Sequence, residues 1–119
     1  MIFEVENYAS LRSELERFCQ FLESRNVAKE RVFDSRLVAC ELVGNVLKHA
    51  KEKATFCVEV KNGFVELCVY AQTPFVPPKN SRNAELYEEH GRGLFLVNEL
   101  CRGQITAEED GIVVYMDIE

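Results

Sequence analysis

The sequence lacks an apolar run long enough to cross a bilayer. Its first residues, Met1 to Glu6, also lack the basic start and long apolar stretch of a secretory signal peptide. No low-complexity tract and no internal repeat is visible. These absences argue against a membrane protein and against a secreted one, so we expect a soluble protein of the cytoplasm.

Cysteine is present, but without the spacing that would give it a defined role. The five cysteines are odd in number, include no C-x-x-C pair and stand within apolar patterns. A disulfide framework is therefore not expected, and the spacing disfavours a zinc site that combines them with His49 and His90. We expect buried, reduced thiols at Cys19, Cys40, Cys57, Cys68 and Cys101.

Positive charge is also in short supply. The chain has a net charge of −6, which argues against nucleic acid as the main partner and favours a protein or a small molecule. A length of 119 residues allows one domain with a real core but is too short for two. We therefore expect a single domain over residues 1–119.

The first half of the chain predicts one strand and two helices. Residues 2–6 alternate like a strand, and Asn7 is a suitable N-cap for a helix whose apolar positions recur to Leu22. Asn26 marks a break. A longer helix then follows over residues 30–50, and it loses its polar face in its second half.

A hairpin and a long connection follow. Residues 55–61 and 64–70 alternate with the period of a strand around Asn62-Gly63, which is a strong two-residue turn signal. Residues 71–89 contain three prolines and little periodicity. Because loops of this length in compact domains are usually functional, we expect a lid over about residues 71–90.

The last part of the chain predicts a helix and a second hairpin. The helix covers residues 91–100, and the hairpin joins 104–108 to 112–118 through a turn at Asp110-Gly111. The resulting order segregates helices from largely antiparallel strands. It predicts an α+β fold in two layers, with one mixed, mostly antiparallel sheet covered on one face by helices.

Two polar residues interrupt an otherwise apolar part of the second helix. Between Leu37 and Leu47 only Glu41 and Asn45 carry polar side chains, and His49 follows at the same spacing. Positions four and eight apart sweep only about 80° of an α-helix, so the three form one slanted stripe. An unpartnered buried amide alone costs about 1–3 kcal/mol, so these side chains require a partner, such as a ligand.

A second signal lies at the start of the last helix. His90 is followed by Gly91, Arg92, Gly93 and Leu94, and this segment opens the apolar helix. Glycines directly before a helix N-terminus are typical of a phosphate-binding site, because backbone N–H groups and the helix dipole both favour an anion there.

Together these motifs resemble the GHKL (Bergerat) ATP-binding fold. The resemblance rests on Glu41-x-x-x-Asn45-x-x-x-His49, on Pro74-Phe75-x-Pro77 after the hairpin, and on Gly91-Arg92-Gly93-Leu94. It covers nearly the whole chain. Within the superfamily the chain is most similar to the bacterial anti-sigma factor serine kinases.

The resemblance implies roles for the stripe on the second helix. Asn45 would be the Mg²⁺ ligand, since Mg²⁺ prefers oxygen donors. Glu41 would be the catalytic base that takes a proton from a serine hydroxyl or orients a water. A helix cap or a buried hydrogen-bonded pair is the structural alternative for both. His49 would lie near the outer shell of the ion, with a bond to the helix's last carbonyls as the favoured alternative.

The resemblance also implies a nucleotide site at the last helix. Gly91 and Gly93 would let the backbone approach the phosphates of ATP, with Arg92 and Leu94 in the same segment. A lid hinge or a tight helix start is the alternative for the glycines, and it is compatible with nucleotide contact.

The chain departs from the family in the part that would bind adenine. The family's aspartate and its following glycine align with Tyr70 and Gln72, and the threonine of its last hairpin aligns with Ile112. Two lost hydrogen bonds at about 1–3 kcal/mol each predict weakened ATP binding. Gln72 would offer a compensating contact if its carboxamide paired with the adenine edge.

Two functions follow from these residues. The first is a regulatory protein that binds Mg-ATP, holds a sigma factor inactive and phosphorylates a serine or threonine of an anti-sigma factor antagonist. The second is a binding module of the same fold that acts by sequestration without productive ATP binding. The ATP-binding half of a split sensor kinase ranks last. The resemblance also implies a homodimer, for which Ile2, Phe3 and Val5 offer apolar edge-strand material.

Overall fold

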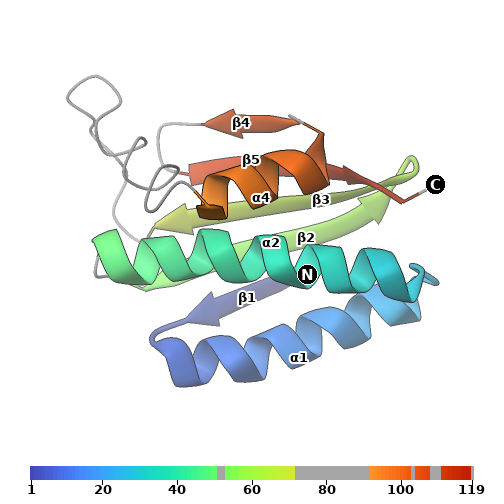
Figure 1. Cartoon of the computed structure of the whole chain (residues 1–119). Coiled ribbons are helices and arrows are strands. Elements are labelled where there is room, and N and C mark those ends of the chain that lie inside the picture. Colours follow the sequence, from blue (N-terminus) through green and yellow to red (C-terminus); the bar gives the residue numbers. More distant parts are fainter. Residues whose placement is uncertain (51–52, 72–91, 103, 108–110, 119) are drawn as a thin grey trace.

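A computed structural model describes residues 1–50, 53–71, 92–102, 104–107 and 111–118. They form two layers, a sheet and three helices on one of its faces (Figure 1). The elements are, in order, β1 (Ile2–Val5), α1 (Tyr8–Ser24), α2 (Lys29–Asn45), the π-helix η1 (Val46–Ala50), β2 (Ala54–Lys61), β3 (Phe64–Ala71), α4 (Arg92–Cys101), β4 (Ile105–Ala107) and β5 (Gly111–Asp117). The predicted α+β fold is confirmed.

The five strands lie in the order β1-β2-β3-β5-β4. Each pairing among the described strands is antiparallel, so the sheet is antiparallel where the sequence predicted a mixed one. Hairpin β2–β3 turns at Asn62 and Gly63, whose φ angles of 55° and 78° match the positive values that a tight hairpin turn requires. This predicted turn is confirmed.

Helix α1 begins as the sequence indicates. The Asn7 side chain accepts a hydrogen bond from the Ser10 N–H (2.9 Å), and the Ser10 hydroxyl oxygen accepts one from the Asn7 N–H (3.0 Å). This reciprocal pair is a capping box. The predicted break is also present, because Asn26 adopts a φ of 64° just after the helix ends.

The core lies between the sheet and the helices. Phe3 of β1 stacks on Phe56 of β2 with ring centroids 4.8 Å apart, and Phe18 of α1 meets both rings edge-on. Such contacts add about 0.5–1.5 kcal/mol per pair beyond the apolar area that they bury. Phe3 and Val5 are therefore core residues, and of the three residues expected at a dimer edge only Ile2 is exposed.

Helix α2 occupies the middle of the helical layer, between α1 and α4 (Figure 1). Its apolar residues cover the sheet, and the buried Ser35 hydroxyl donates to the sulfur of Met116 on β5 (3.3 Å). The helix changes to π geometry after Asn45, so the uniform α-helix expected to residue 50 was wrong in its last turn. A π turn adds a residue, and such turns are frequent at functional sites.

Candidate functional site

Asn45 and Glu41 mark the candidate site on α2. Asn45 is 8% exposed, one of two buried polar residues among those described, and the half-buried Glu41 precedes it by one turn. Arg36 and Cys40 face α1. At about 100° per residue, Glu41 is turned by about 100–140° from these two residues and Asn45 by about 140–180°. Glu41 and Asn45 therefore lie on the flank of α2 that faces α4.

Helix α4 completes this side of the molecule. It packs against α2 and β5 through residues that include Val97 and Cys101, which are 1% and 0% exposed. The N-terminal end of α4 lies beside the C-terminal half of α2 (Figure 1). An anion held at that end would meet backbone N–H groups and the positive end of the helix dipole.

The structure describes the backbone of some of the remaining predicted site residues and leaves others outside the described ranges. Arg92, Gly93 and Leu94 form the first turn of α4, as expected, and the backbone of His49 lies in the π-helix. Their side-chain positions are outside what the structure describes. Gln72 and Gly91, together with the predicted lid over residues 71–90 except Ala71, also lie outside the described residues.

Comparison with protein families agrees with this geometry. The family model described as a histidine kinase-like ATPase domain matches residues 3–118. The chain belongs to this family. No curated protein matches the chain. The match spans both Asn45 on α2 and the first turn of α4, so the elements that carry the candidate site are part of the histidine kinase-like ATPase domain.

The donor set of this ATPase domain suits Mg²⁺ bound together with a nucleotide. Asn45 would offer one amide oxygen, and Mg²⁺ in nucleotide sites takes one or two protein ligands while phosphates and water supply the rest. A cage of three or more His, Cys, Asp or Glu side chains is not found among the described residues, and such a site does not need one. Asn45 also takes part in an interaction within the protein.

The adenine side of the domain requires a correction. Val69 is 1% exposed on the helix-covered face, and Tyr70, the next residue of β3, lies on the opposite face across from Gly111. Tyr70 therefore does not face the helical layer, which carries the candidate site. By the alternation of a strand, the next residue of β3 on the same face as Val69 is residue 71, an alanine. Counting this alternation from the buried valines in the sequence would have identified residue 71 as the position that corresponds to the family's aspartate.

Ile112, which aligns with the family's threonine, lies on the helix-covered face of β5. Ile112 pairs with Val69, and at 2% exposure it lies in the layer between sheet and helices. Gly111, which the sequence placed in a turn, is instead the first residue of β5 and is buried. Neither Ala71 nor Ile112 has a hydrogen-bonding side chain, so weakened adenine recognition stays a prediction, with Ala71 in place of Tyr70.

The expectation of five buried thiols was wrong for four of them. Cys101 alone is buried, Cys40 is exposed, and Cys19, Cys57 and Cys68 are intermediate. Burial raises the pKa of the Cys101 thiol to about 11. Partial burial and the Glu41 carboxylate raise the pKa of Cys40, while Arg36 lowers it.

None of the helices in the described ranges combines the length and apolar character that a membrane crossing requires.

Proposed function

We propose that this domain binds Mg-ATP between α2 and the N-terminal end of α4 and transfers the terminal phosphoryl group to a serine or threonine of a partner protein. The observation that carries this proposal is the buried amide of Asn45, one turn after Glu41, on the flank of α2 that faces α4. The family match over residues 3–118 supports ATP as the ligand.

Each residue has a distinct task in this proposal. The bound ion would neutralise charge on the nucleotide phosphates. Asn45 would hold and orient the ion through its amide oxygen, and the first N–H groups of α4 would hold the phosphate oxygens. Glu41 would accept the proton of the attacking hydroxyl, which is the task that phosphoryl transfer leaves to a carboxylate.

The regulatory setting is part of the proposal. The resemblance to anti-sigma factor serine kinases suggests that the phosphorylated partner is an antagonist protein and that the domain holds a sigma factor inactive. Edge strand β1, with Ile2 65% exposed, suits a homodimer contact. Sedimentation of the wild type and of Ile2→Lys tests the dimer, and co-purification with a sigma factor tests the partner.

Thermal unfolding with and without Mg-ATP tests the nucleotide site. A ligand at about 100 times its Kd adds about 2.7 kcal/mol to stability, so a clear rise in Tm is expected. Asn45→Ala should abolish the rise, whereas Asn98→Ala on the exposed side of α4 should keep it. Glu41→Gln should keep the rise and lose phosphoryl transfer from labelled ATP, with Glu99→Gln as its control.

A second function is favoured by the adenine side of the site. Ala71 and the buried Ile112 provide no polar contact to a base, which fits a module that regulates by sequestration alone. An unchanged Tm at millimolar ATP, combined with intact partner binding, would select this function over the kinase.

A further inference from the structure

A hollow lies between α1 and α2, on the flank of α2 that faces away from α4. Its volume is about 180 Å³, and it is lined by Tyr8, Leu11, Arg12, Leu15, Arg36 and Cys40. Pockets for small molecules usually enclose about 300–1,000 Å³. A hollow of this size suits one or two side chains of a protein partner better than a nucleotide.

Two arginines give the hollow its chemistry. Arg17 and Arg31 on the same helices form ion pairs with Glu14 and Asp34. Among the described residues, neither Arg12 nor Arg36 has such an acidic partner.

The arginines also stand out against the charge of the whole chain. Its net charge is −6, yet two of the six residues that line this hollow are arginines. Guanidinium groups bind carboxylates with two parallel hydrogen bonds, so the hollow is complementary to an acidic side chain.

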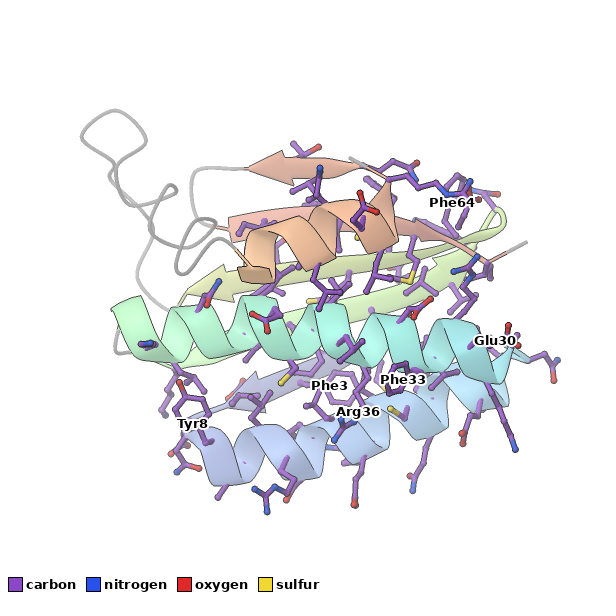
Figure 2. The ribbon with its side chains drawn as sticks, viewed as in Figure 1. Phe3, Tyr8, Glu30, Phe33, Arg36 and Phe64 are labelled. Carbon is purple, nitrogen blue, oxygen red and sulfur yellow. The ribbon has the colours of Figure 1, made fainter. Side chains whose placement is uncertain are left out.

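Exposed aromatic rings flank the arginines along the α1–α2 seam. Tyr8 near the start of α1 is 58% exposed and Phe33 of α2 is 60% exposed, with Arg36 near the middle of the seam (Figure 2). Phe33, Arg36 and Cys40 are three and seven residues apart, so they share one side of α2. Tyr and Arg are, together with Trp, enriched at the energetic centres of protein interfaces.

We propose that the α1–α2 seam binds an acidic segment of a partner protein, with an Asp or Glu between Arg12 and Arg36 and an adjacent apolar side chain against Leu11 and Leu15. This site is distinct from the nucleotide site, because Cys40 and Asn45 are turned about 140° from each other around α2. It requires no bound nucleotide, so the two proposals can fail independently.

Selection of phage-displayed random peptides on the intact protein, without nucleotide, tests the proposal. The enriched peptides should carry Asp or Glu next to an apolar residue. Arg12→Glu and Arg36→Glu should each weaken their binding roughly tenfold or more, since each leaves a carboxylate facing a carboxylate. Lys29→Glu, an equal charge change on α2 outside the hollow, should leave their binding unchanged.

Alkylation of Cys40, followed by mass spectrometry, locates the bound peptide. The exposed Cys40 lines the hollow, so a selected peptide should slow its modification while Cys57 on β2 reacts at its usual rate. Absence of enrichment, peptides that bind Arg36→Glu normally, or unprotected Cys40 would each overturn the proposal. Equal protection by inorganic phosphate at the peptide's concentration would overturn it too, because the hollow would then take a free anion.

Discussion

Tyr70 lies directly opposite Gly111 in the β3–β5 pair, and the space beside the glycine is filled by the tyrosine ring. A Cβ atom built on Gly111 would lie 2.3 Å from the Val69 carbonyl oxygen and 2.5 Å from Cδ1 of Tyr70. An aromatic ring over a glycine on the neighbouring strand restores packing that the missing side chain removes. The pair is therefore a structural feature of the helix-free face of the sheet.

Gly111→Ala should destabilise the fold by about 1–3 kcal/mol, the usual cost of overpacking. Part of the clash is with backbone, at the Val69 carbonyl. Combining it with Tyr70→Ala should therefore recover only part of the loss. Urea denaturation of the two single variants and the double variant gives the coupling energy. Full recovery in the double variant would mean that the ring alone makes the clash.

Ala71→Asp should strengthen Mg-ATP binding, because it places a carboxylate acceptor at a position that strand alternation assigns to the helix-covered face. A gain of about tenfold corresponds to a hydrogen bond of about 1.4 kcal/mol. Tyr70→Asp is the matched control, since Tyr70 lies on the helix-free face opposite Gly111. Isothermal titration distinguishes the two. Stronger binding in Tyr70→Asp and not in Ala71→Asp would reverse the assignment made from the strand register.

The buried Cys101 should make stability fall at alkaline pH. Its pKa is raised from 9.0 to about 11, so above pH 9 the unfolded chain releases a proton that the folded chain retains. The contribution is complete below pH 9 and is lost as pH rises toward 11, by about 2–3 kcal/mol in total. Urea denaturation at about pH 8 and about pH 10.5 should show a smaller loss in Cys101→Ala than in the wild type, with Cys57→Ala as the half-buried control.

Asn7→Ala should destabilise the protein by about 1 kcal/mol, because the Ser10 N–H at the start of α1 loses its side-chain acceptor. Asn7→Asp retains an acceptor and should cost much less. Thermal unfolding of both variants, compared with the wild type, measures the difference. Equal losses in the two variants would show that the cap contributes nothing through its side-chain oxygen.

Local signals in the sequence predicted most of the elements. The Asn7 cap, the break at Asn26 and the Asn62-Gly63 turn all lie where the residues indicate, since each depends on the backbone preferences of a few neighbouring residues. The burial of Asn45 was also expected from the apolar residues around it.

Features that depend on the register between distant strands were harder to predict. Aligning Tyr70 with a family motif placed it one residue away from the pocket position, because motif spacing does not show which face a strand residue occupies. Cys40 follows an apolar pattern and yet is exposed, since that flank of α2 meets α1 across a hollow. Glycine is common in turns, but Gly111 pairs with Tyr70 within the sheet.

The π-helix η1 sets a constraint on chain length at the end of the central helix. A turn of five residues, Val46–Ala50, accommodates one residue more than the α-helical ladder that precedes it. Removing one residue there would restore regular winding and rotate every later residue of the helix by about 100°. A deletion within Val46–Ala50 would therefore change the direction in which the chain leaves the helix. The number of residues in this short segment therefore determines where the chain points as it continues toward β2.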